Sequence, residues 1–180
     1  MTTATRREDD VALIITRTFD APRDLIFKAM TEPDRLAKWW GPKGFNWISG
    51  TLDLRPGGTF HYCMRSPDGH DMWGKFQYRE IVPPEKLVFT SSFSDPQANT
   101  VRAPFSANFP IEILNTFLFT EANGKTTLNM RGIPFNATDA ERQFFAQMHP
   151  SMQQGFAGTF DQLSEYLASV RNESSSGSNA

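Results

Sequence analysis

The sequence predicts an α+β domain in which one long C-terminal helix packs against an antiparallel sheet. Three observations support this prediction. Apolar residues recur at helical spacing near both ends of the chain, residues 45–130 alternate apolar and polar residues, and two turn motifs join strands into hairpins. A helix with one apolar side needs a second layer to cover it, and a sheet with one apolar face supplies that layer.

The N-terminal part of the chain predicts one strand followed by two short helices. The segment 11–20, VALIITRTFD, is β-branched and apolar, which is typical of a strand. Pro22 suits the start of the first helix, and Pro33 begins the second, which ends at Gly41–Pro42. The apolar sides of the two helices comprise Leu25, Ile26, Ala29 and Met30, then Leu36, Trp39 and Trp40.

The motif SPDG at 66–69 predicts the first hairpin and its register. Pro67 and Asp68 suit a type I turn, and Gly69 suits the left-handed position that follows. If Ser66 opposes His70, the pairs are Met64 with Met72, Tyr62 with Gly74 and Phe60 with Phe76. One face then carries Phe60, Tyr62, Met64, Met72, Phe76 and Tyr78, and the other carries His61, Cys63, Trp73 and Lys75. The even-numbered face is therefore strongly aromatic.

The rest of the predicted sheet contains one irregular segment and one clear hairpin. Residues 92–110 have three prolines and little periodicity, which indicates either a long loop or hairpin ends with mobile tips. Residues 111–132 form a hairpin with its turn at Asn123–Gly124.

The C-terminal segment predicts a long amphipathic helix. It opens at Thr138, and Glu141 three residues later completes a capping-box pattern. Pro150 should kink or split the helix. Gly155 and Gly158 indicate either close approach of the helix to the sheet or room for something between them. The apolar stripe comprises Phe145, Met148, Met152, Phe156, Phe160, Leu163 and Leu167.

The composition limits the classes of function. We expect one domain at 11–170, with a flexible N-terminus at 1–10 and a disordered tail at 171–180. A net charge of −2 without a basic cluster argues against nucleic-acid binding. The one cysteine, Cys63, excludes an intrachain disulfide and fits the cytoplasm. No signal peptide or membrane-length apolar run is present, so no membrane insertion is expected.

The sequence offers no strong catalytic or metal-binding motif. The three histidines lack ligand spacing, so no metal site is predicted, and no cofactor motif was found. Cys63 and His61 share a strand face, but a lone cysteine is usually a small buried hydrophobe. The acid–base candidates are Tyr62, Tyr78, Glu112, Arg131 and His149. Each also has a structural interpretation, so we predict no catalytic residue.

Four segments carry a resemblance to a known superfamily: FDAPRDLIFKAMTEPDRLAKWWGPKGF (19–45), DLRPGGTFHYCMRSPDG (53–69), GKFQYREIVPPEKLVFT (74–90) and MQQGFAGTFDQLSEYL (152–167). With the order of elements, they resemble the START-like, or birch-pollen-allergen-like (SRPBCC), helix-grip proteins. Within these, the chain is most similar to bacterial homologues of the activator of the heat-shock protein 90 ATPase. The resemblance covers about residues 11 to 170. It implies a curved sheet wrapped around the long helix, with a cavity that opens near the short helices and loops.

The resemblance turns the aromatic face into a candidate binding site. The same side chains would either form a packed core or line a cleft for an apolar small molecule or lipid-like ligand. We predict that they line a cleft, and that this cleft binds the ligand without catalysing a reaction on it. The predicted lining comprises Phe60, Tyr62, Met64, Phe76, Tyr78, Phe117, Met152, Phe156 and Phe160, and the rim comprises Trp39, Trp40 and Trp73.

Two alternative functions follow from the same resemblance. The first is a protein-interaction module that stimulates a chaperone ATPase in a stress response, although this sequence does not contain the further N-terminal domain of the eukaryotic activator. The second is a cyclase-like or hydrolase-like enzyme that uses the same cavity. Exposed aromatic residues such as Trp73 leave both a monomer and a homodimer open.

Overall fold

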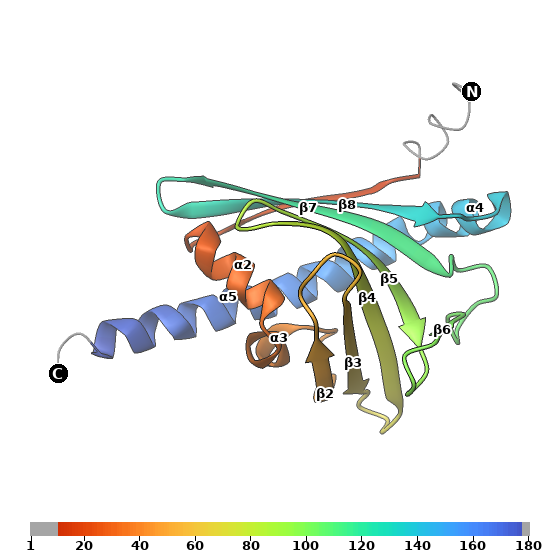
Figure 1. The fold of residues 1–180 in the computed structure, drawn as a ribbon, viewed down its shortest axis with the longest axis horizontal. Coiled ribbons are helices and arrows are strands. Elements are labelled where there is room, and N and C mark those ends of the chain that lie inside the picture. The colour runs from red at the N-terminus through yellow and green to blue at the C-terminus, as the bar shows by residue number, and fades with distance from the viewer. Residues whose placement is uncertain (1–10, 178–180) are drawn as a thin grey trace.

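The computed structural model describes residues 11–177, with side chains as far as Arg171. Within this range, eight antiparallel strands form one curved sheet around a long helix, which confirms the predicted α+β helix-grip fold (Figure 1). The sheet order is β1-β8-β7-β5-β4-β3-β2, and β6 pairs with β5. The strands are β1 (Leu13–Phe19), β2 (Asn46–Leu52), β3 (Thr59–Arg65), β4 (Asp71–Val82), β5 (Lys86–Ser94), β6 (Thr100–Val101), β7 (Glu112–Ala122) and β8 (Lys125–Phe135).

Four helices accompany the sheet in the described part of the chain: α2 (Arg23–Thr31), α3 (Pro33–Trp39), α4 (Asp139–Gln147) and α5 (His149–Gly177). Helix α5 enters the predicted tail and continues to Gly177. The predicted flexible segment 1–10 and residues 178–180 lie outside the described residues.

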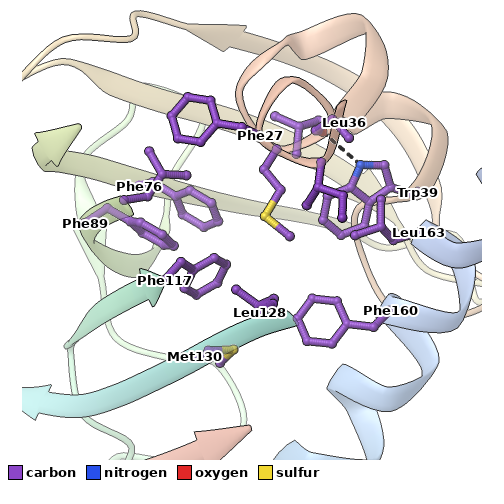
Figure 2. Close-up of a cluster of buried hydrophobic side chains, with 14 of the residues drawn as sticks. Phe27, Leu36, Trp39, Phe76, Phe89, Phe117, Leu128, Met130, Phe160 and Leu163 are labelled. Carbon is purple, nitrogen blue, oxygen red and sulfur yellow. Dashed lines mark hydrogen bonds between the residues drawn. The ribbon is translucent and has the colours of Figure 1, made fainter. Parts of the chain in front are cut away.

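The two short helices lie where the sequence predicts them. Pro22 is the extended N-cap of α2, and Pro33 is the first residue of α3. The indole nitrogen of Trp39 donates a hydrogen bond of 2.9 Å to the carbonyl of Ala29, which joins the two helices (Figure 2). Gly41 follows α3 with φ +115°, in the left-handed region that favours glycine.

Both hairpins have the predicted registers. Ser66 N bonds to His70 O, and Met64, Tyr62 and Phe60 pair with Met72, Gly74 and Phe76 respectively. The β7–β8 turn falls at Asn123–Gly124, since Ala122 pairs with Lys125. Residues 92–110 contain the end of β5 and its partner β6, which fits the hairpin alternative better than one long loop.

The C-terminal helix starts and divides as predicted. The backbone nitrogen of Glu141 donates to Thr138 Oγ1 at 3.1 Å, and the backbone nitrogen of Thr138 donates to Glu141 Oε1 at 3.0 Å. Pro150 divides the predicted helix into α4 and α5. It lies in the first turn of α5, where its missing N–H removes no helical hydrogen bond.

The densest part of the core lies between α5, the two short helices and the sheet. Phe160 and Leu163 are fully buried, and Figure 2 shows Leu163 beside Trp39 and Phe160 beside Leu128. Gln162 Nε2 donates to the carbonyls of Trp39 and Gly41, at 3.1 and 2.7 Å. These contacts fix the C-terminal part of α5 against α3.

Candidate functional site

A cavity of about 360 Å³ lies between the inner face of the sheet and the N-terminal part of α5. Its wall is formed by β3, β4, β5, β7 and β8, by α4 and α5, and by the turn after α3. The lining side chains are nearly all apolar, and none of those in the described chain is charged. Such a volume and lining suit a small apolar molecule.

The structure brings eight of the twelve predicted site residues to this cavity. They are Tyr62, Met64, Phe76, Phe117, Met152 and Phe156 of the predicted lining, with Trp40 and Trp73 of the predicted rim. Trp40 packs edge-on against Phe76 and Tyr62, with ring centroids 5.3 and 6.2 Å apart. The hairpin register therefore identified the correct side of β3 and β4.

The other four residues, Phe60, Tyr78, Phe160 and Trp39, lie outside this cavity in the packed core. Trp47 of β2 stacks on Phe60 at 6.1 Å, and Phe19 of β1 meets Phe160 edge-on at 5.9 Å. Tyr78 and Trp39 border a separate space of about 10 Å³, which is no larger than one water. Neighbouring elements thus cover these four residues.

Trp73 differs from the other predicted rim residues. Its ring stacks on the ring of His61, with centroids 4.9 Å apart and planes 20° apart. His61 belongs to the odd-numbered face of the hairpin, and its Nε2 lies 3.1 Å from the carbonyl of Asp95. The Trp73 side chain is therefore held by a neighbour on its own, odd-numbered face of the hairpin, which is opposite the aromatic face.

The structure gives no support to nucleophilic chemistry at Cys63. The residue is fully buried, and burial raises the pKa of its thiol. A thiol reacts as the thiolate, so a raised pKa makes it less nucleophilic at neutral pH. Cys63 is therefore a small side chain packed in the core.

The acid–base candidates do not converge. His149 Nε2 lies 2.8 Å from the carbonyl of Val11, and its ring meets Phe145 edge-on. Glu112, Arg131 and His149 are not among the residues that line the cavity. Tyr62 is thus the one acid–base candidate at the cavity among the described residues.

Tyr62 stays protonated at physiological pH. Burial raises the pKa of its phenol to about 12, and an interaction with the Trp40 indole N–H offsets part of the rise. Trp40 Nε1 is fully buried and has no well-formed hydrogen bond to any described residue. The two side chains therefore offer uncharged polar groups on an otherwise apolar wall.

Several lining residues were missed by the sequence-based prediction. Ile113, Asn115 and Met130 line the cavity beside Phe117. Residues 113, 115 and 117 share one face of a strand, and Phe117 pairs with Met130, so the hairpin register contained this signal. Phe93, Phe109 and Ile111 also contribute, from a segment whose sequence has no periodicity to reveal it.

The two helix glycines have different surroundings. A Cβ on Gly155 would meet nothing within 4 Å, and this exposed residue borders the cavity. A Cβ on Gly158 would meet the side chain of Lys43 at 3.5 Å, which is ordinary contact. Gly155 thus leaves room beside the cavity, in agreement with one of the two predicted alternatives.

The described residues contain no group of three His, Cys, Asp or Glu side chains placed to hold a metal ion. None of the described helices has the length and apolarity needed to cross a membrane.

Solved structures of bacterial proteins share this fold. Protein Ms6760 from Mycobacterium smegmatis is 28% identical with a TM-score of 0.72, covering 89% of this chain and 92% of its own. NE0264 from Nitrosomonas europaea is 22% identical with a TM-score of 0.71, and the match covers 89% of this chain and 96% of NE0264. A protein from Arthrobacter aurescens is 22% identical with a TM-score of 0.73, covering 89% and 88%. Among curated proteins, none matches the sequence.

The family comparison agrees with the fold. The model of the family described as "Activator of Hsp90 ATPase homolog 1-like protein" matches residues 20–168, which include both short helices, most of the sheet and the buried part of α5. The chain therefore belongs to the family of activator of Hsp90 ATPase homologue 1-like proteins.

Proposed function

We propose that the protein binds a hydrophobic small molecule or lipid-like ligand in the cavity between the sheet and α5, without transforming it. The observation that carries this proposal is a largely apolar cavity of about 360 Å³, whose lining contains no charged side chain from the described residues. Protein interiors rarely leave such volume unfilled, because the lining atoms forgo contacts with a packed neighbour. A bound apolar molecule would restore those contacts.

Binding is favoured over catalysis because general acid–base chemistry needs groups that converge on a substrate. Tyr62 meets the cavity without a second titratable side chain from the described residues. A phenol with a pKa of about 12 is also a poor proton acceptor near neutral pH.

The family description favours a second candidate, an interaction with a chaperone ATPase. Under this candidate the protein would act in a stress response through its surface, as a monomer or a homodimer. We place either function in the cytoplasm, where the lone Cys63 would stay reduced. Failure to bind or stimulate a bacterial chaperone of that class would remove the second candidate.

Native mass spectrometry of protein purified from a bacterial extract tests the first candidate directly. We expect a discrete additional mass on the folded protein that is released on denaturation. If only the bare protein is found, a tight resident ligand is excluded, and titration with an apolar probe then decides whether the cavity binds weakly.

The titration uses the fluorescent probe N-phenyl-1-naphthylamine and two variants that each add one tryptophan. Phe156→Trp adds bulk at the cavity, whereas Leu118→Trp adds it at an exposed position of β7 that does not line the cavity. We expect Phe156→Trp to weaken probe binding at least about tenfold, a loss of roughly 1.4 kcal/mol. Leu118→Trp should bind like the wild type. Equal binding by both variants would contradict this assignment of the site.

A further inference from the structure

The cavity lining contains few polar side chains, and two of them, Asn115 and Thr159, donate their hydrogen bonds to the protein itself. Asn115 Nδ2 donates to Ser91 Oγ at 2.9 Å and to the carbonyl of Ile113 at 3.1 Å. Thr159 Oγ1 donates to the carbonyl of Gly41 at 3.0 Å. The donor protons of Asn115 and Thr159 are therefore directed at protein acceptors.

The Tyr62 hydroxyl is not occupied in this way. Its side chain lines the cavity and only 8% of the residue is exposed, yet its hydroxyl donates to no described residue. Buried hydroxyl groups normally have hydrogen-bond partners, and an unpartnered one costs stability. The hydroxyl is therefore available to an acceptor inside the cavity.

The sheet leaves space for this hydroxyl. Gly74 pairs directly with Tyr62 across β3 and β4, and a Cβ there would lie 2.5 Å from Tyr62 Oη. Any other residue at 74 would displace the phenol. Trp40 packs edge-on against Tyr62, with ring centroids 6.2 Å apart.

From this geometry, and on the basis of the proposed binding function, we infer that the ligand is an uncharged apolar molecule with a carbonyl-type oxygen that accepts a hydrogen bond from Tyr62. A carboxylate fits poorly, because none of the described residues that line the cavity is cationic and a buried unpaired charge is costly. A pure hydrocarbon would leave the Tyr62 hydroxyl without an acceptor.

The cavity volume limits the size of this ligand. A cavity of ~150 Å³ accommodates benzene, or ~25 Å³ for each carbon atom. On that scale a cavity of about 360 Å³ holds roughly 14 non-hydrogen atoms. Two aromatic rings joined through a ketone meet both the size limit and the need for a carbonyl oxygen.

Three probes of similar shape separate these requirements: benzophenone, diphenylmethane and diphenylacetate. We expect the wild type to bind benzophenone most tightly and diphenylacetate at least about 100-fold more weakly. In Tyr62→Phe, the ratio of benzophenone affinity to diphenylmethane affinity should fall about tenfold. Diphenylmethane should bind at least as well as before, which also shows that the variant is folded. Calorimetric titration gives all three affinities.

Tyr78→Phe is the matched control. It removes another buried hydroxyl without a described partner, but one that lies outside the cavity, so the affinity ratio should not change. The infrared band of the benzophenone carbonyl provides a second measurement, since its hydrogen-bonded shift should disappear in Tyr62→Phe and persist in Tyr78→Phe.

Two results separate this inference from the proposed function. If the neutral probes bind equally well, or if Tyr62→Phe keeps the wild-type ratio, the role of Tyr62 is wrong although the cavity binds ligands. Tight binding of diphenylacetate would likewise overturn the inference of an uncharged ligand. If no probe binds, the proposed function and the inference both fail.

Discussion

The apolar stripe of helix α5 is continuous, yet its N-terminal half (152–156) and its C-terminal half (160–167) face different surroundings. Met152 and Phe156, in the N-terminal half, are partly buried and border the cavity. Phe160, Leu163 and Leu167, in the C-terminal half, are at most 2% exposed and lie in the packed core. The periodicity of the stripe is the same in both halves, so the difference comes from the layer opposite the helix.

The short helices supply that difference. Leu36 and Trp39 of α3 fill the space beside the C-terminal half of the stripe (Figure 2). Arg35 Nη1 also donates to Tyr166 Oη at 3.1 Å. In the N-terminal half, Gly155 adds no side chain, and the facing sheet leaves volume unfilled. An apolar helix face thus shows that something covers it, but whether protein or ligand does so depends on the other elements.

Replacing a phenylalanine of either half with alanine should have the largest effect on the free energy of unfolding, and the effect should differ between the two halves. Phe160→Ala removes a fully buried ring and should lower the free energy of unfolding by about 3–5 kcal/mol. Phe156→Ala removes a ring that already borders empty space, so we expect roughly half that loss. Urea unfolding of the two variants measures the difference. Equal losses would mean that the two halves are packed alike.

High pH should destabilise the cavity half through Tyr62. Its pKa is about 12 in the folded protein and about 10 in the unfolded chain. Between pH 10 and 12 the unfolded state has lost this proton and the folded state has not, so stability falls as pH rises. Two pKa units correspond to a loss of about 2–3 kcal/mol.

Denaturant unfolding at pH 9 and pH 11.5 measures this effect, with Tyr62→Phe as the comparison. We expect a smaller fall in stability in the variant, because it lacks the Tyr62 phenol. Some fall should remain, because the variant retains Tyr78, whose pKa burial also raises. An identical fall in wild type and variant would show that Tyr62 does not carry the dependence.

Replacing a helix glycine beside the cavity with alanine should have the smallest effect on the free energy of unfolding, and this effect should be stabilising. Gly155→Ala adds a methyl group into open space within a helix and should raise the free energy of unfolding by about 0.5–1 kcal/mol. Gly158→Ala is the matched substitution beside Lys43. Thermal unfolding gives both changes, and destabilisation by Gly155→Ala would mean that the space is not open.

Local sequence signals predicted most of the fold. The SPDG turn determined the β3–β4 register, and Thr138 with Glu141 marked the start of α4. These motifs work because their hydrogen bonds form between residues close in the sequence.

The boundary between core and cavity could not be predicted in the same way. Phe60 and Tyr62 share one strand face, and the sequence gives no reason to separate them. The structure separates them although Trp47 stacks on both rings: Phe60 is fully buried in the core, while Tyr62 lies over Gly74 and lines the cavity. Such differences depend on contacts between elements distant in the sequence, and so does the contribution of Phe93 and Phe109 from the irregular segment.

The missing side chain at Gly155 has a kinetic consequence. This glycine is exposed and also borders the cavity, and a passage at this position would run along the flank of the helix. A molecule that exchanges through this passage does not require α5 to separate from the sheet. Its residence time would then follow its affinity and the width of the passage, and would be independent of the rate at which the domain unfolds.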